Sequence, residues 1–290
     1  MATPSRRRVV LAAMLATVTL AFGGSAAVGA APGPTADPCP GGLEPNLVPI
    51  VPHHLQVQNT GQRETLRLTN GIANVAGGPW HLHPETVLGD TGGTTTAVQD
   101  IWSTEGGVSD PSSTIVCSFP TTQFEFHASH NHWHIGSVAS FSVVGALDDG
   151  HGAAFGPVVV NDLGIAQSFK TTFCLIDWVR IDAKKKTPDV TYWACDRTAP
   201  FQGVSVGWID QYHHSLEGQE VDLTGAPVGI YYLRVDVNDE GTFVESDRTD
   251  NLAWRSFALT RDSQGNPKIT LISSSPCSTP NMCGNQLPNR

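Results

Sequence analysis

Short runs of β-forming residues, separated by turn residues, are the feature of this sequence that most limits its fold. Such runs appear at residues 64–70, 137–144, 168–177, 229–237 and 252–259. Turn signals such as NG, GG, DDG and NDEG separate them, and the chain contains 29 glycines and 20 prolines. No long amphipathic helical pattern interrupts the series. We therefore expect a mainly β fold, an antiparallel β-sandwich or barrel-like single domain with long loops and little helix.

The amino-terminal residues have the pattern of an export signal. Arg6, Arg7 and Arg8 precede an apolar run at residues 9–22, and small residues follow that run. The run is too short to span a bilayer, and no later segment approaches ~20 uncharged apolar residues. We therefore expect a secreted, extracellular protein. Its expected parts are a signal peptide at 1–31, a flexible linker at 32–44, a main domain at 45–275 and a disulfide-stapled tail at 276–290.

The charge of the chain limits its partners. The formal net charge is −10, which argues against nucleic acid as a partner because affinity for nucleic acid depends on cationic side chains. An acidic surface attracts cationic molecules instead.

Six cysteines in an exported chain predict three disulfides, although six cysteines allow fifteen pairings. One pair brackets a short polar loop near the carboxyl end, and a second pair flanks the polar loop DAKKKTPDV. The favoured pairings are Cys277 with Cys283, Cys174 with Cys195, and Cys39 with Cys117. Only the first is firm, and the sequence leaves the pairing of the other four cysteines open.

The segment FHASHNHWHIG, residues 126–136, holds four of the eleven histidines of the chain. On a strand, His130, His132 and His134 would point to one face. Three imidazoles can hold a transition metal, and copper(II) heads the affinity order for nitrogen donors. In a flat strand the outer two Cα atoms would lie ~13 Å apart, so a bend or bulge is required. We expect His127 to support the site rather than to bind the metal.

A second His-x-His pair, His81 and His83 in WHLHP, carries less weight. A single pair of this kind is more often solvent-facing and metal-free, and that is our expectation for these two residues.

At the histidine segment the chain resembles the catalytic domain of the lysyl oxidase family, copper amine oxidases that oxidise peptidyl lysine. HASHNHWH resembles the copper-binding segment of the family, in which the last three histidines ligate copper. SFKTTFCL is similar to the segment with the cofactor lysine, which falls on Lys170, and the region around DQYHH to the segment with the cofactor tyrosine, Tyr212. PNLVP and ESDRTDNLAWRSF resemble the opening and closing segments. The resemblance therefore runs in order from about residue 45 to about residue 260.

The resemblance implies a self-made cofactor, lysine tyrosylquinone, formed from Lys170 and Tyr212 beside copper held by His130, His132 and His134. The family uses this cofactor and O2 to deaminate primary amines, in peptidyl lysine or small molecules, to aldehydes with release of ammonia and hydrogen peroxide. Taken alone, Lys170 would be a solvated strand lysine and Tyr212 a partly buried loop tyrosine. The order of the matching segments favours the catalytic interpretation.

Two residues beside the tyrosine are candidates for the base that removes the α-proton of the substrate. They are Asp210 and His213, although a turn carboxylate and a surface histidine explain them equally well.

An acidic segment near residue 247 resembles a calcium site of the family. Its carboxylate and amide oxygens are ligands that suit Ca²⁺. The expected ligands are Asn46, Glu245, Asp247, Asp250 and Asn251. A solvated acidic turn is the alternative.

The chain departs from the vertebrate pattern at three cysteine positions. Ser129 stands in the histidine segment, and Trp208 and Gly218 stand around the cofactor tyrosine. In the family, the cysteine that Cys195 matches pairs with the one missing at Ser129, so the resemblance pairs Cys195 with Cys174. The chain also lacks scavenger-type repeats and a long arginine-rich propeptide, so we expect a bare, bacterial-type domain. The alternative function is a non-catalytic, copper-binding extracellular β domain, which would keep the histidines but form no quinone.

Overall fold

The structure is a computed structural model that describes residues 38–86, 93–128, 131–159, 172–184, 188–196, 199 and 201–284. These residues belong to one compact unit, Asp37–Arg290. They form strands β1 to β16 and a single 3-10 turn, η1 (Gly107–Ser109). The mainly β prediction is confirmed, and the predicted signal peptide lies outside the described residues. Within the described part, no helix has the length and hydropathy needed to cross a membrane.

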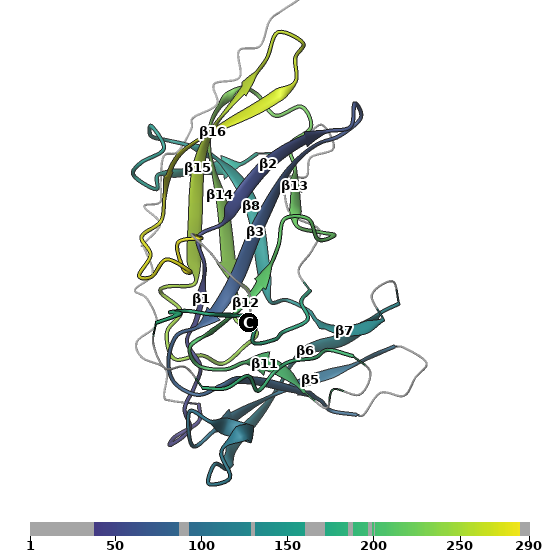
Figure 1. The fold of residues 1–290 in the computed structure, drawn as a ribbon, viewed down its shortest axis with the longest axis vertical. Coiled ribbons are helices and arrows are strands. Elements are labelled where there is room, and N and C mark those ends of the chain that lie inside the picture. The colour runs from purple at the N-terminus through teal and green to yellow at the C-terminus, as the bar shows by residue number, and fades with distance from the viewer. Residues whose placement is uncertain are drawn as a thin grey trace, which may run out of the picture. The chain divides into compact units, whose positions relative to one another are not determined.

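The strands form three antiparallel sheets (Figure 1). The first sheet has the order β16 (Pro267–Ser274), β15 (Leu252–Arg261), β14 (Gly229–Val237), β8 (Ala139–Ala146) and β9 (Phe155–Val158). The second is built on β3 (Glu64–Asn74), which pairs with β1 (Leu47–Pro49), β2 (His53–Asn59), β13 (Glu220–Asp222) and β12 (Trp208–Tyr212); β12 also pairs with β10 (Val179–Arg180). The third has the order β11 (Gln202–Val204), β4 (Trp80–Pro84), β5 (Thr94–Trp102), β6 (Ile115–His127) and β7 (His132–Ile135).

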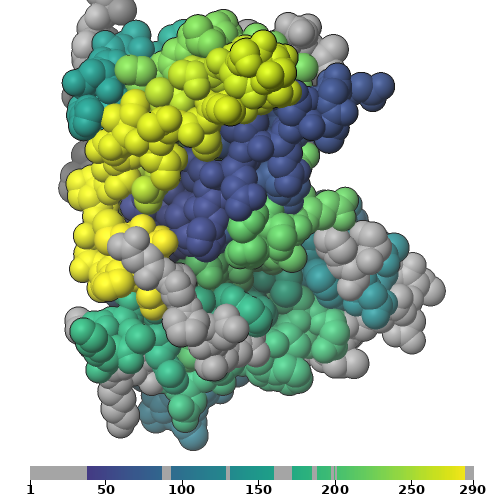
Figure 2. All heavy atoms as spheres, turned by 45° about the horizontal axis from the view of Figure 1, so that its top comes forward, coloured from purple at the N-terminus to yellow at the C-terminus, as the bar shows by residue number. Residues whose placement is uncertain are grey.

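One apolar core joins the three sheets. β3 contributes Leu66 and Leu68, β8 contributes Phe141 and the third sheet contributes Trp80 and Trp133, all in one buried cluster. Successive side chains on a strand point to opposite faces, so alternating apolar residues bury one face of β8 and β14. In Figure 1, β2 and β3 cross over β14 and β8, and Figure 2 shows the C-terminal residues, in yellow, against the first strands.

Four of the five predicted β runs coincide with strands. Residues 64–70 lie in β3, 137–144 largely in β8, 229–237 in β14 and 252–259 in β15. The fifth prediction is wrong where the structure describes it. Within residues 172–177 only Phe173 makes a β-bridge, to Ile135. The next two N–H groups, of Cys174 and Leu175, donate to side chains, so no continuous strand ladder forms.

All three favoured disulfide pairings are present: Cys39–Cys117, Cys174–Cys195 and Cys277–Cys283. The first anchors the described end of the predicted linker, where the Leu43 N–H also donates to the Trp102 carbonyl at 2.8 Å. In the tail, the Met282 carbonyl accepts a hydrogen bond from the Val51 N–H at 2.9 Å. The domain boundaries proposed from the sequence remain predictions.

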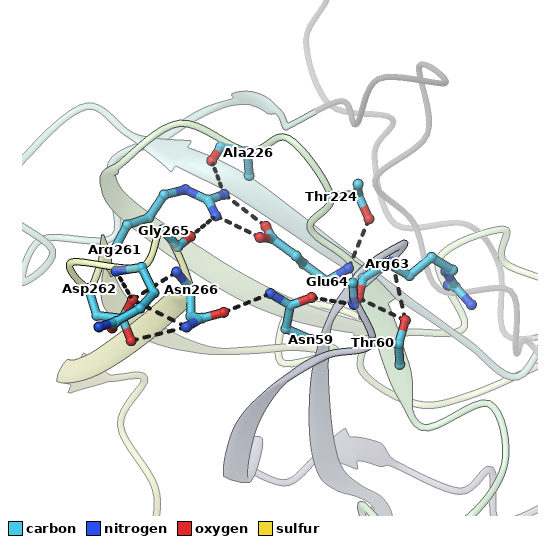
Figure 3. Close-up of polar contacts among 12 residues, drawn as sticks. Asn59, Thr60, Arg63, Glu64, Thr224, Ala226, Arg261, Asp262, Gly265 and Asn266 are labelled. Atoms are coloured by element: carbon cyan, nitrogen blue, oxygen red, sulfur yellow. Dashed lines mark hydrogen bonds and ion pairs between the residues drawn. The ribbon is translucent and has the colours of Figure 1, made fainter.

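Charged and polar contacts join the ends of two hairpins (Figure 3). Arg261, the last residue of β15, donates from both terminal nitrogens to the Glu64 carboxylate at 2.6 and 2.8 Å. The same guanidinium donates to the Ala226 carbonyl at 3.1 Å. Asn59, at the end of β2, donates to Asn266 at 3.2 Å. A bidentate arginine–carboxylate pair fixes orientation as well as distance, so these contacts hold the first sheet against the second at this end.

His53 on β2 is buried beneath the carboxyl-terminal loop. Its side chain lies against Gly284, where an added Cβ would come within 2.5 Å of the imidazole ring. Burial lowers the pKa of His53 to about 4, from an ordinary value of 6.5. The folded protein therefore keeps this imidazole neutral at a pH where the unfolded chain protonates it.

This difference predicts a specific loss of stability in acid. Because the pKa of His53 is lower in the folded state, its contribution is intact above pH 6.5 and falls as the pH drops toward 4. We expect His53→Gln to flatten the pH dependence of the free energy of unfolding by up to about 1.4 kcal/mol per pH unit. Urea unfolding between pH 7 and pH 4 measures this slope. The exposed-site control His151→Gln should keep the wild-type slope, and an unchanged slope in His53→Gln would contradict the assignment.

Candidate active site

The histidine segment forms a β-hairpin. His127 at the end of β6 pairs with His132 at the start of β7, and the Asn131 N–H donates to the His127 carbonyl at 2.8 Å. Asn131 has a φ of +56°, a left-handed conformation that asparagine tolerates better than most residues. The strand begins at His132, directly after this turn residue. His130 lies outside the described residues.

Two of the predicted metal ligands converge. The Nε2 atoms of His132 and His134 are 2.8 Å apart, and His134 is buried. The Nδ1 of His134 lies 3.2 Å from the hydroxyl of Thr172. When Nδ1–H of His134 donates to that hydroxyl, the lone pair of its Nε2 faces His132. An outer hydrogen bond of this kind orients a metal-binding imidazole. This nitrogen donor set suits copper, so the described residues fit the ion that the family resemblance implies.

His127 packs against this pair. Its ring centroid is 4.0 Å from that of His134, and its Nε2 is 3.7 Å from the Glu125 carboxylate.

Tyr212 ends β12 with its hydroxyl held by backbone. The hydroxyl donates to the Cys174 carbonyl at 2.9 Å and accepts from the Cys174 N–H at 2.6 Å. The ring of Phe173 meets the tyrosine ring edge-on, with 4.9 Å between centroids. Burial, and next the charge of Asp210, raise the pKa of Tyr212 well above its ordinary value of 10. The side chain is therefore a neutral phenol at physiological pH.

Residues 172–175, here called the bridging segment, connect the histidines to the tyrosine. Phe173 exchanges two backbone hydrogen bonds with Ile135 of β7, at 2.7 and 2.9 Å. Thr172 then lies at His134, and Cys174 lies at Tyr212. The bridging segment therefore contacts both a histidine of β7 and the tyrosine of β12.

Gln202 on β11 is a buried side chain that joins the bridging segment to β7. It is 2% exposed, accepts a hydrogen bond from the Leu175 N–H at 3.1 Å and donates to the Trp133 carbonyl at 2.7 Å. The Cys195 carbonyl accepts from the Trp133 N–H at 2.9 Å, so the Cys174–Cys195 disulfide ties in the same strand.

A pocket of about 780 Å³ opens over these groups. His132, His134 and Tyr212 line it together with both candidate bases, Asp210 and His213. Asp210 is buried, and His213 is exposed. The other lining residues are Cys174, Ile176, Trp178, Gln211, Leu216 and Glu217. The structure thus brings Tyr212 to two of the three predicted copper ligands, whereas Lys170 lies outside the described residues.

His213 also belongs to a cluster that the sequence analysis missed. Ring nitrogens of His54, His213 and His214 lie within 4.8 Å of one another. The signal in the sequence was two His-His doublets, at residues 53–54 and 213–214, but the pairing of β2 and β12 with β3 is needed to join them.

The expectation that His81 faces solvent is wrong. His81 is 4% exposed, because the rings of Tyr192, Phe201 and Trp102 pack around it at centroid distances of 5.7, 4.9 and 5.4 Å. His83 is half-buried, and both histidines lie against Asp100 of β5.

The acidic segment comes together with the amino-terminal strand. The Glu245 carboxylate accepts from Asn251 at 2.7 Å and from the Leu47 N–H at 3.2 Å. Asp250 accepts from Asn46 at 3.2 Å. In the described part of the chain, the Oδ1 atoms of Asn46, Asp250 and Asn251 are buried without a hydrogen-bond partner. Buried oxygen acceptors without donors are what a bound Ca²⁺ would satisfy, so this donor set fits calcium.

Burial raises the pKa values of Glu245 and Asp250. Asp247, the fifth predicted ligand, is exposed, and its Oδ1 accepts from the Thr249 N–H and hydroxyl, both at 2.7 Å.

Comparison with known proteins matches the chain to one family. Residues 109–264 match the family model for lysyl oxidase, more than half of the chain. The chain belongs to the lysyl oxidase family. Over 133 residues, 46% of the chain, it is 33% identical to human lysyl oxidase homolog 1, and over 138 residues, 47% of the chain, it is 31% identical to chicken protein-lysine 6-oxidase. The aligned stretch spans only 20% and 28% of those two relatives.

The hydrogen bonds of Gln202 predict that its side chain contributes strongly to the stability of the fold around the site. Gln202→Leu would leave the buried Leu175 N–H and Trp133 carbonyl without these partners. Each buried group left unsatisfied costs roughly 1–3 kcal/mol, so we expect a loss of roughly 2–6 kcal/mol in the free energy of unfolding. Denaturant unfolding measures it. Gln58→Leu, at an exposed position of β2, is the matched control and should change little; equal effects of the two substitutions would show that the buried contacts contribute nothing.

Proposed function

We propose that this protein is a secreted copper amine oxidase, similar to protein-lysine 6-oxidase, that deaminates primary amines to aldehydes with a self-made lysine tyrosylquinone. The proposal rests on one observation. The bridging segment hydrogen-bonds to His134 through Thr172 and to Tyr212 through Cys174. Primary amines, either peptidyl lysine or small amines, are the proposed substrates, and O2 is the proposed oxidant.

His132 and His134, with His130, would hold the copper, and Tyr212 with Lys170 would supply the quinone. Copper(II), if bound there with O2, would supply the oxidising power for turning the phenol into a quinone, and a quinone would supply an electrophilic carbonyl for the substrate amine. Lys170 precedes Thr172 by two residues, a length of chain that reaches at most ~7 Å. The contact of Thr172 with His134 therefore limits how far the lysine backbone can lie from the metal ligands.

The neighbouring side chains suit a cationic substrate. Asp210 and Tyr212 are two residues apart on β12 and line the same pocket, where Asp210 would accept the proton from the substrate carbon next to the amine. Glu217, also lining the pocket, would attract the ammonium form of the amine. The hydrogen bonds of Cys174 hold the phenol ring in a fixed orientation before any chemistry.

Two substitutions test the cofactor. Copper-loaded wild-type protein should show a visible absorption band that responds to phenylhydrazine and should release hydrogen peroxide from a primary amine. Lys170→Ala and Tyr212→Phe should lose both signals by at least two orders of magnitude, because each removes a partner of the crosslink.

Tyr231→Phe is the matched control, since the Tyr231 hydroxyl also donates to a backbone carbonyl, that of Pro227, but on β14 away from the pocket. It should keep both signals. Copper binding without the phenylhydrazine-sensitive band in wild type would instead favour the non-catalytic copper-binding domain.

The oxygen cluster formed by Asn46, Glu245, Asp250 and Asn251 is proposed as a calcium site with a structural role, with Asp247 at its exposed edge. Its ligands come from residue 46 and from residues 245–251, so a bound ion would join β1 to the loop before β15.

Calcium should therefore stabilise the fold by mass action, by about 2.7 kcal/mol at one hundred times the dissociation constant. Asp250→Ala should abolish the calcium-dependent rise of the melting temperature, whereas Asp149→Ala, at an exposed loop, should retain it. A calcium-dependent rise of equal size in Asp250→Ala would exclude these ligands.

A further inference from the structure

We propose that His81, His83 and Asp100 form a second transition-metal site, separate from the histidines of β7. The site would take a divalent ion of borderline softness, with Zn²⁺ as the reference ion, and would clamp strands β4 and β5 of the third sheet together.

The backbone places the three side chains on one face of this sheet. His81 and His83 are two residues apart on β4, so both side chains point to the same side of the sheet. Asp100, on the neighbouring strand β5, is directly opposite His81. One ligand atom from each residue lies within 4.8 Å of the others. The Asp100 Oδ2 is 3.0 Å from Nδ1 of His83 and 3.8 Å from Nε2 of His81. Tetrahedral zinc with bonds of 2.0–2.1 Å separates its ligand atoms by about 3.4 Å, midway between these two distances.

Two hydroxyl groups hold the ligands from outside. The Tyr192 hydroxyl lies 3.0 Å from Nδ1 of His81, which leaves Nε2 of that ring directed toward Asp100. The Ser118 hydroxyl donates to Oδ1 of Asp100 at 2.6 Å, which leaves Oδ2 directed toward both histidines. Metal-binding side chains are commonly oriented by such outer hydrogen bonds. The arrangement is therefore that of a supported three-ligand site.

Burial adds an electrostatic reason for a cation here. Asp100 is 2% exposed, and a buried carboxylate needs a compensating positive charge. The side chain of His83 is 36% exposed and leaves a route by which an ion can enter and a water can complete the coordination.

The site is separate from the proposed copper site. Both lie in the third sheet, but β4 is three strands away from β7 in the order β4-β5-β6-β7. With strands spaced 4.7–4.9 Å apart, the two sites are separated by roughly 14 Å. An ion at His81 would therefore not contact the groups of the candidate active site.

The test uses the full chain after removal of all metals. His132→Ala and His134→Ala remove two of the three proposed copper ligands, and His213→Ala removes one histidine of the exposed three-histidine cluster. This triple variant, equilibrated with Zn²⁺ alone and then desalted, should retain one zinc per chain by elemental analysis. Its melting temperature should rise with zinc.

Adding His83→Gln to the triple variant should abolish both the retained zinc and the rise, whereas adding His151→Gln should leave both unchanged. His151 is the matched control because it also pairs with a carboxylate, Asp149, at 3.2 Å, but on an exposed loop. Asp100→Asn keeps the side-chain shape and serves as a second loss variant if His83→Gln is poorly folded.

Zinc retention that survives both His83→Gln and Asp100→Asn would overturn the proposal, as would the absence of retained zinc in the triple variant. Neither outcome depends on quinone formation or oxidase activity, so the result stands apart from the test of the proposed function.

Discussion

The hydrogen bonds of the bridging segment hold the candidate active site together. Residues 172–175 contribute almost no regular secondary structure, yet their backbone binds Ile135, the Tyr212 hydroxyl and the Gln202 amide. Each partner belongs to a different strand, β7, β12 or β11. The segment therefore holds residues from three strands next to one another. The Cys174–Cys195 disulfide restrains the segment covalently. Phe173 and Leu175 are buried, so a loss of their backbone pairing would leave polar groups unsatisfied in an apolar core.

The architecture was predictable because it depends on local patterns. Alternation along β8 and β14 and the turn residues between them determine strands whatever their partners are, so those runs were located correctly. Disulfide pairing followed from loop closure and from resemblance. The strand predicted at residues 168–177 was wrong where it is described, because its composition suits a strand but the Cys174 and Leu175 N–H groups donate to side chains distant in sequence.

The sites were predictable in part, for a related reason. His132 and His134 are neighbours on one strand, so their convergence could be expected from spacing alone. The meeting of Tyr212 with the histidines came only from the family resemblance, because long-range strand order is not encoded in local pattern. The burial of His81 beside Asp100 was missed, since a cross-strand neighbour and the aromatic cover of Tyr192 appear only in the folded chain. Clusters made by strand pairing are the sites that single-sequence interpretation overlooks.

The account requires that the residue two positions before Thr172 can bond to the ring of Tyr212 beside the metal-binding histidines. Peptide mapping by mass spectrometry after incubation of the metal-free protein with copper and oxygen tests this most directly. The account predicts a crosslinked pair of peptides, one containing Lys170 and the other Tyr212, which is absent when copper is withheld. Complete recovery of both peptides as separate, unmodified species after copper loading would contradict it.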